Sequence, residues 1–196
     1  DNGSGADADP DGDALTVSAV NGVAGNVGAA TAGSNGGSFT IGADGTFSFD
    51  PGADFDDLAV GQTRTTTATY TISDGEGGTS TATVTVTVTG VNDAPVSTAL
   101  ANQTGADASS VNLDVSGAFS DPDASDVLAF SASGLPAGLS IDPATGVISG
   151  TIDRSASVSG PYTVTITATD PSGSATSQTF TWDVTNPAPA AQNDAF

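Results

Sequence analysis

Residues 79–90 read TSTATVTVTVTG, and this stretch decides the fold class. Its apolar residues Ala82, Val84, Val86 and Val88 alternate with threonines along the whole stretch. A period of two places successive side chains on opposite faces of an extended backbone. The stretch therefore predicts a half-buried β-strand with its valines facing inward and its threonines facing outward.

The residues just before this strand complete a hairpin. Residues 66–78, TTATYTISDGEGG, place Ala68, Tyr70 and Ile72 at alternate positions and then break into glycines around Asp74. Glycine-rich turns between two alternating runs are typical of β-hairpins. We therefore expect two long antiparallel strands joined by a loop at Asp74.

The same hairpin recurs around Asp170, within residues 161–186, PYTVTITATDPSGSATSQTFTWDVTN. In both copies the apolar residues of the returning strand have the same spacing from the loop aspartate: Val84, Val86 and Val88 after Asp74, and Phe180, Trp182 and Val184 after Asp170. An acidic loop that opens into a short alternating strand also occurs twice, at residues 7–20 and 120–133. A pattern repeated at this scale predicts two domains in tandem.

No stretch of the chain shows helical spacing of apolar residues, so the predicted fold class is all-β, with two tandem antiparallel β-sandwiches. We place the first domain at residues 1–93 and the second at residues 94–187. Residues 188–196 are expected to be a linker and the start of a next repeat.

The charge balance is extreme. The chain has 23 acidic residues against two arginines, Arg64 and Arg154, and no lysine or histidine, for a formal net charge of −21. Phosphate binding needs a basic face, so a nucleic-acid partner is excluded. Cysteine is absent, which excludes disulfides and thiolate metal sites, and no apolar run is long enough to predict a membrane span. Close like charges oppose a compact fold unless cations are held among them.

The carboxylates gather where the predicted strands end, and this placement predicts calcium binding. Calcium takes six to eight oxygen ligands, and carboxylates two residues apart in a short loop can converge on it. We expect the opening loop, the hairpin loop and the exit segment of each domain to meet in one cluster. Asn92 and Asp93 could also share an ion with the second domain. The candidate ligands are Asp7, Asp9, Asp11, Asp13, Asp74, Glu76, Asn92 and Asp93 for the first domain and Asp121, Asp123, Asp126, Asp170 and Asn186 for the second.

Turn formation is the alternative explanation for these aspartates. Asp-Pro, Asp-Gly and Asn-Asp pairs are ordinary turn formers, whose carboxylates accept backbone N–H groups without any metal. We favour metal for the whole set because the clusters are repeated, fall at strand ends and have no basic neighbour. Asp50, Asp54, Asp56 and Asp57 lie in the middle of the first domain, and there we expect a solvated loop.

Several segments resemble known families. DPDGDALTV (9–17), DGTFSFDPGADF (44–55), LAVGQTRTTTATYTISDGEGG (58–78) and GVNDAP (90–95) together resemble a VCBS-type bacterial cadherin-like repeat. GLPAGLSIDPATGVISGT (134–151) resembles the Putative Ig or dystroglycan-type cadherin-like module. The resemblance implies tandem, extracellular, usually calcium-binding sandwiches of the Ig/cadherin-like kind. It also implies that the first repeat lacks its first strand here, which would leave a bare sheet edge.

These observations predict a calcium-rigidified extender or stalk of a bacterial surface adhesin, in contact with neighbouring repeats of its own chain. A calcium-dependent polysaccharide-binding module and homophilic contact through the sandwich faces are the alternatives. Catalysis is not expected, because serine and threonine lack a histidine, lysine or cysteine to activate them. Trp182 shares a strand face with Phe180 and Val184, so we expect it in the core and not in a sugar-stacking platform.

Overall fold

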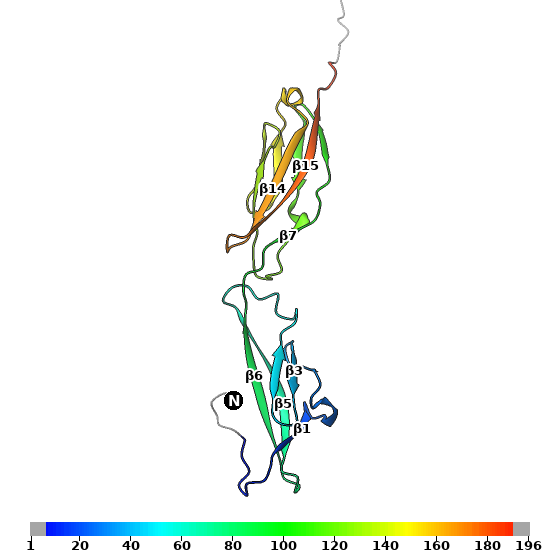
Figure 1. Ribbon diagram of the computed structural model, residues 1–196. Coiled ribbons are helices and arrows are strands. Elements are labelled where there is room, and N and C mark those ends of the chain that lie inside the picture. The colour runs from blue at the N-terminus through cyan, green and yellow to red at the C-terminus, as the bar shows by residue number, and fades with distance from the viewer. Residues whose placement is uncertain (1–6, 190–196) are drawn as a thin grey trace, which may run out of the picture. The chain divides into compact units, whose positions relative to one another are not determined.

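The computed structural model describes residues 7–189. The secondary structure of these residues consists of β-strands and three short 3-10 turns (Figure 1). The chain divides into two compact units, Asp1–Val91 and Asn92–Phe196. The predicted all-β class and the tandem arrangement are confirmed. The division falls between Val91 and Asn92, so Asn92 and Asp93 belong to the second unit, two residues earlier than the boundary we expected. The segment expected to open a next repeat, residues 190–196, lies outside the described residues.

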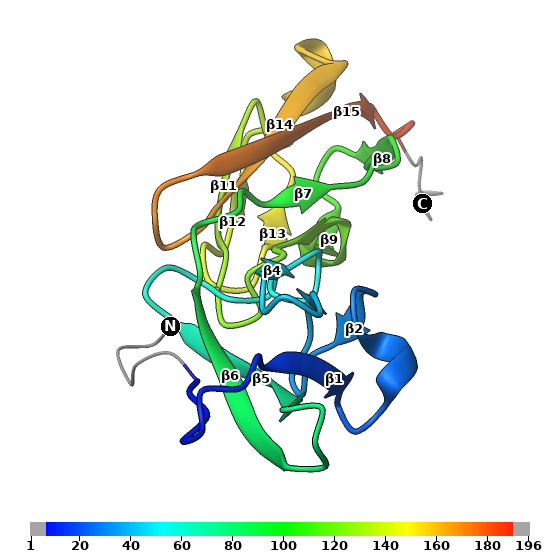
Figure 2. The same ribbon diagram turned by 60° about the horizontal axis from the view of Figure 1, so that its bottom comes forward.

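The first unit has two three-stranded sheets, ordered β1-β5-β6 and β2-β3-β4, and Figure 2 shows β1, β5 and β6 side by side. The predicted hairpin is confirmed: β5 and β6 pair antiparallel from Thr63 opposite Thr89 to Ser73 opposite Thr79. The elements are β1 (Thr16–Val20), η1 (Ala24–Asn26), β2 (Thr31–Ala32), β3 (Ser38–Ile41), β4 (Phe47–Asp50), β5 (Thr63–Ser73) and β6 (Thr79–Thr89).

Burial in the first unit follows the predicted alternation. The threonines of β6 are exposed, while Ala82, Val84, Val86 and Val88 are half-buried. The fully enclosed side chains come from other strands of the unit, including Val20 of β1 and Phe39 of β3 at 0 % exposure. The sheet face that β6 presents to the core is therefore only partly covered.

The second unit has a four-stranded sheet ordered β11-β14-β15-β8, a three-stranded sheet ordered β12-β13-β9, and the short pair β10-β7. Strand β8 pairs with β15 in parallel, whereas the β14–β15 hairpin is antiparallel. The elements are β7 (Val96–Ser97), β8 (Gln103–Ala106), β9 (Ser110–Asp114), η2 (Ser116–Ala118), β10 (Phe119–Ser120), β11 (Ala129–Ser133), β12 (Leu139–Ile141), β13 (Val147–Thr151), η3 (Ala156–Val158), β14 (Tyr162–Thr169) and β15 (Ala175–Thr185).

The core of the second unit lies between its two larger sheets. Ile148 of β13 and Ile166 of β14 have no exposed surface. On β15, Phe180 and Trp182 are only 4 % and 2 % exposed, and their ring centroids are 6.0 Å apart. The prediction that Trp182 packs in the core is confirmed, and the ring is not accessible for stacking on a sugar.

Candidate metal centre

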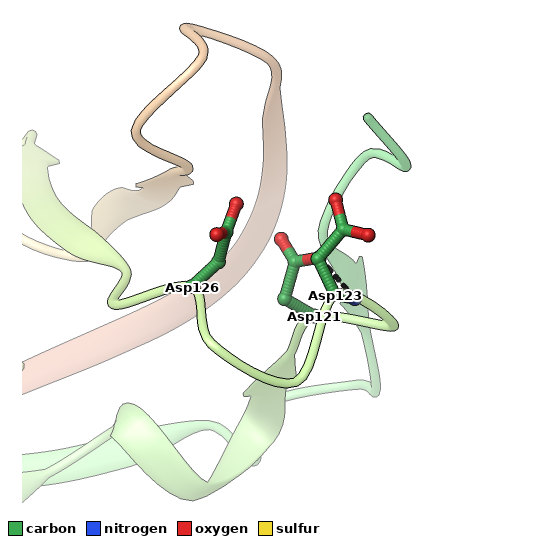
Figure 3. Close-up of side chains that lie close together, drawn as sticks. All are labelled: Asp121, Asp123 and Asp126. Carbon is green, nitrogen blue, oxygen red and sulfur yellow. Dashed lines mark hydrogen bonds between the residues drawn. The ribbon is translucent and has the colours of Figure 1, made fainter. Parts of the chain in front are cut away.

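One loop between β10 and β11 carries three carboxylates that come together. Each of Asp121, Asp123 and Asp126 offers an oxygen, and these oxygens lie within 4.8 Å of one another. Figure 3 shows the three side chains rising from the same curved loop. The loop is curved by its own hydrogen bonds: Asp123 N donates to Asp121 Oδ1 at 2.9 Å, and Asp126 N donates to the carbonyl of Asp123 at 3.0 Å.

Two further segments of the second unit are tied to this loop. Asn92 Nδ2 donates to Asp170 Oδ2 at 2.9 Å and to Ser174 Oγ at 3.1 Å, in the β14–β15 loop. The backbone N–H of Asp93 donates to Asp123 Oδ2 at 3.0 Å. The entry segment at Asn92 and Asp93 therefore bridges the β10–β11 loop and the β14–β15 loop.

Three oxygens of this cluster are buried without any hydrogen-bond partner: Asn92 Oδ1, Asp121 Oδ2 and Asp123 Oδ1. Asp123 is completely buried. An unsatisfied buried polar atom costs on the order of 1–3 kcal/mol, more when it is charged. Turn formation leaves these three acceptors unexplained, because the turn uses Oδ1 of Asp121 and the entry segment uses Oδ2 of Asp123. A hard cation would satisfy all three, so the residues fit calcium.

The electrostatics of the cluster are unfavourable without a cation. Burial, and then the charges of Asp123, Asp126 and Asp170, raise the pKa of Asp121. Burial and the charges of Asp123 and Asp170 likewise raise the pKa of Asp126. Burial also opposes the charge of Asp170, but hydrogen bonds from Asn92 and from the backbone of its own loop prevail and lower its pKa. Asp170 is thus held ionised beside carboxylates that repel it.

No basic side chain in the described residues compensates these charges. Arg64 lies in the first unit, paired with Asp57. Arg154 precedes η3 and the start of β14, whereas Asp170 follows the end of β14, so the strand separates them. The described residues therefore supply no positive charge to the cluster.

The opening loop of the first unit is built differently. Asp9 Oδ1 accepts the backbone N–H groups of Asp11 at 2.8 Å and Asp13 at 3.3 Å. Asp7 Oδ2 accepts the hydroxyl of Tyr70 at 2.8 Å, and this bond, together with burial and the charge of Asp7, raises the pKa of Tyr70. These carboxylates organise a turn and hold it against β5.

Asp74 also has a turn role. Its Oδ1 accepts the backbone N–H groups of Glu76, Gly77 and Gly78 at 2.8, 3.0 and 2.9 Å. Asp74 and Asp9 line the same shallow hollow. Among residues 7–91, however, no three carboxylates converge as those of the β10–β11 loop do. Calcium binding at the first-unit residues stays a prediction.

The structure corrects two of the expected groupings. Asn92 and Asp93 do not meet the Asp74 loop, because that loop lies at one end of the 11-residue strand β6 and Asn92 follows the other end. Asn186 does not meet Asp170 for the same reason, since the 11-residue β15 separates them. Sequence reasoning placed the hairpin loop and the exit segment together, although a long strand always puts them at opposite ends.

Two of the acidic residues in the middle of the first unit, Asp54 and Asp57, make structural contacts in a largely exposed loop. Asp57 forms an ion pair with Arg64, which lowers the pKa of that carboxyl, and the Arg64 guanidinium lies 5.6 Å from the centre of the Phe55 ring. Asp54 Oδ2 accepts the backbone N–H of Gly37 at 2.7 Å. The ion pair was not anticipated from the sequence. The hydrogen bond from Asn92 to Ser174 was also not predicted, because the position of Ser174 in the sequence does not distinguish it from other loop serines.

Comparison with known families agrees with the two units. Residues 1–90 match the family described as bacterial cadherin-like domain, and residues 94–185 match the family described as Putative Ig domain. The two matches stand in tandem, a bacterial cadherin-like domain followed by a Putative Ig domain, and they support an adhesion-type repeat module of a typically extracellular kind. The first match does not carry the narrower VCBS label. No curated protein matches the chain.

Solved structures of low sequence identity resemble the chain to different degrees. The human mucin-like protocadherin EC1-2 fragment is 18 % identical, with 91 % of this chain and 86 % of that chain covered and a TM-score of 0.55. Mouse cadherin-23 EC22-24 is 17 % identical over 88 % of this chain and 53 % of that chain, with a TM-score of 0.49. An endo-fucoidan hydrolase of glycoside hydrolase family 107 is 22 % identical over 91 % of this chain but only 24 % of its own, with a TM-score of 0.38. The chain spans 19 to 38 % of the length of the first three structures matched. The likeness to the protocadherin fragment, at 18 % identity, shows the fold alone.

None of the helical turns in residues 7–189 is long and apolar enough to cross a membrane.

Proposed function

We propose that the chain is a calcium-dependent extracellular spacer, a pair of repeat modules in the stalk of a bacterial surface adhesin. The observation that carries the proposal is the set of three buried, unpartnered oxygens of Asn92, Asp121 and Asp123. They lie in a cluster with the carboxylates of Asp126 and Asp170 and without a basic side chain among the described residues. A positive ion bound among these oxygens would stabilise the folded unit.

Calcium fits the donor set better than the common transition metals do. Histidine and cysteine are absent from the chain, so every donor is an oxygen. The ligands would be the carboxylates of Asp121, Asp123, Asp126 and Asp170 with the amide oxygen of Asn92. A bound calcium ion would supply the positive charge that these buried oxygens lack.

The residues of the entry segment give this site a mechanical role. Asn92 and Asp93 already hold the segment against both acidic loops through the side-chain amide and the Asp93 N–H. Neutralising the carboxylates would strengthen that attachment and fix the start of the second unit. Extracellular calcium modules bind in the range of about 10⁻⁴ to 10⁻³ M, so the attachment would form outside the cell.

The role proposed is mechanical and not enzymatic. The only converging carboxylates in residues 7–189 are those that lack a counter-charge, and they suit a cation better than a general acid and base pair. The repeat families to which the two units belong are in general non-catalytic.

Thermal unfolding of the full chain tests the proposal. With free calcium about a hundredfold above its dissociation constant, binding should add about 2.7 kcal/mol to the free energy of unfolding, and EGTA should remove it. Asp123→Asn should abolish the calcium response, and without calcium it should melt no lower than the parent, because it removes one of several repelling charges. Asp183→Asn, at an exposed position of β15, makes the same chemical change outside the cluster and should leave the response intact. Equal melting temperatures in calcium and EGTA would refute the calcium site.

Polysaccharide binding is the second candidate, and it needs exposed aromatic rings. Trp182 is buried, and Phe47, at 49 % exposure, is the one aromatic ring among the well-exposed large apolar side chains of residues 7–189. We therefore rank the spacer first. Retention of the chain on a polysaccharide matrix, lost in Phe47→Ala, would reverse that ranking.

A further inference from the structure

Strands β8 and β15 of the second unit lie side by side and run in the same direction. Their register pairs Gln103 with Trp182 at one end and Ala106 with Thr185 at the other. The other strand pairings among residues 92–189 are all antiparallel. Of the four strands in this sheet, β8 comes first along the chain and β15 comes last. The chain therefore enters the sheet through β8 and leaves it through β15.

This arrangement sets how the pair responds to a pull on the two ends of the unit. The chain reaches β8 at Gln103 and leaves β15 at Thr185. Because the strands are parallel, these two residues lie at opposite ends of the paired segment, and tension slides one strand along the other. In that direction the hydrogen bonds between the strands share the load, whereas a peeling force breaks them one at a time.

Further hydrogen bonds lengthen the connection at both ends. Before β8, Asn102 Oδ1 accepts the backbone N–H of Thr181 at 2.9 Å. After β8, the backbone N–H of Asp107 donates to the carbonyl of Thr185 at 3.0 Å. Thr185 Oγ1 donates to the carbonyl of Gly105 at 3.2 Å. The connection, which we call the β8–β15 ladder, therefore extends from Asn102 to Asp107, beyond the four residue pairs of the strands themselves.

A buried aspartate fixes the carboxyl end of β8 to the rest of the unit. Asp107 is 7 % exposed, and its two carboxylate oxygens accept the backbone N–H of Ser157 at 2.9 Å and the hydroxyl of the same serine at 2.6 Å. The next residue, Ala108, donates its N–H to the carbonyl of Ile152 at 3.0 Å. Strand β8 is thus anchored where it ends, and it cannot move with β15 without breaking these bonds.

The inner side of the ladder lies against the core. Trp182 and Val184 of β15 are only 2 and 5 % exposed. A Cβ on Gly105 would lie 2.7 Å from Ile152 Cδ1 and 3.2 Å from Trp182 Nε1, so glycine allows β8 to lie this close to the core. Hydrogen bonds shielded from water are stronger than exposed ones. Burial therefore strengthens the ladder on this side.

We propose that the β8–β15 ladder is the load-bearing element of the second unit, a mechanical clamp that keeps the unit folded while the chain is under tension. The pairing nearer to the entry segment is too short for this task, because β7 and β10 pair over two residues only. The inference rests on the proposed spacer role for its biological purpose. The ladder itself contains no residue of the candidate metal centre.

Single-molecule pulling of the full chain in two directions tests the proposal. The chain has no cysteine, so handles attach only to cysteines introduced at exposed alanines. Handles at Ala99→Cys and Ala188→Cys load the ladder along its length, whereas handles at Ala108→Cys and Ala188→Cys pull apart strand ends that lie together. Both pairs leave the first unit outside the loaded segment. Lengthwise unfolding should need several times the force of the other direction, and equal forces would overturn the clamp.

Two further measurements separate the clamp from the calcium site. The difference between the two directions should persist in EGTA, so a chain without any calcium response can still show the clamp. Handles at Ala94→Cys and Ala188→Cys add β7 to the loaded path and should give the same unfolding force as handles at Ala99→Cys and Ala188→Cys. A much higher force from Ala94→Cys would place the main resistance before β8 and would refute the proposal, whatever the melting curves show about calcium.

A matched pair of variants connects the resistance with the ladder. Asn102→Ala removes the bond to Thr181 and should lower the lengthwise unfolding force. Asn112→Ala makes the same change at an exposed position of β9, outside the ladder, and should leave that force unchanged. Their melting temperatures show any general loss of stability. A lengthwise force that falls equally in both variants, or in neither, would mean that the ladder is not the origin of the resistance.

Discussion

Asp123 and Asp142 show two different roles of an aspartate in a loop. Both follow or precede a proline in a tight loop. Asp142 Oδ1 accepts the N–H groups of Ala144 and Thr145 at 2.8 and 3.1 Å, and the side chain is exposed. Asp123 is fully buried and keeps one oxygen without a partner. The first carboxylate is satisfied by its turn, while the second keeps a buried oxygen that a cation could bind.

The turn role of Asp142 predicts a pH dependence. Hydrogen bonds from Ala144 and Thr145 lower its pKa. A carboxyl whose folded pKa lies below its unfolded value stabilises the fold above the unfolded pKa, near 4, and loses that contribution as the pH falls through the folded pKa. Asp142→Ala should therefore lower the melting temperature at pH 7, and the difference from the parent should shrink towards pH 2. Thermal unfolding at a series of pH values measures the difference, and a difference that is constant with pH would contradict the ionic origin.

The two hairpins β3–β4 and β12–β13 show how one sequence pattern leads to different packing. Ile41 lies opposite Phe47 in the first, and Ile141 lies opposite Ile148 in the second. Only the second hairpin has a further strand, β9, beside it. The same local geometry therefore places one apolar residue in a closed core and the other at an open edge.

Truncation of the two equivalent residues should have unequal effects. Ile148→Ala leaves a cavity in a closed core and should cost about 2–5 kcal/mol of unfolding free energy. Phe47→Ala removes a ring that is already 49 % exposed, so its cost should fall clearly below the range of about 3–5 kcal/mol for a buried phenylalanine. Urea denaturation of the two variants measures both costs. An equal or larger loss for Phe47→Ala would show that the first unit is closed along β4.

At the scale of the whole molecule, the candidate metal centre belongs to one unit only. Its ligand atoms all come from the unit Asn92–Phe196. The single tryptophan of the chain, Trp182, lies in the core of that unit. Its fluorescence therefore reports the unfolding of the second unit selectively, while circular dichroism at β-sheet wavelengths reports both units.

Calcium should act on one unfolding transition. We expect calcium to raise the midpoint of the tryptophan transition and to leave the remaining circular dichroism transition unchanged. Asp121→Asn should remove the shift, and Asp183→Asn serves as the control on the exposed side of β15. A second transition that also shifts with calcium, and loses the shift in Asp74→Asn, would show that the acidic loops of the first unit bind calcium as well. An unshifted tryptophan transition would contradict the site in the second unit.

The sequence by itself determined the fold class and the doubled architecture. The alternation from Thr79 to Thr89 and its counterpart around Trp182 predict long strands, because the period of side-chain direction in a strand is two and does not depend on tertiary context. The equal spacing after Asp74 and Asp170 likewise predicts two similar hairpins. The aspartates of the β10–β11 loop could be named as candidate ligands from the sequence because they are close along the chain.

Only the tertiary structure decided which acidic residues act together. Asn92 joins the cluster of the second unit, and Asn186 lies away from Asp170, because the length and direction of β6 and β15 set which loops share an end. The structure also decided which carboxylates have hydrogen-bond partners. Asp74 and Asp9 each accept backbone N–H groups in exposed turns. Asp121 and Asp123 each keep one buried oxygen without a hydrogen-bond partner. Burial depends on residues distant along the chain, so no local pattern can separate a turn aspartate from a metal ligand.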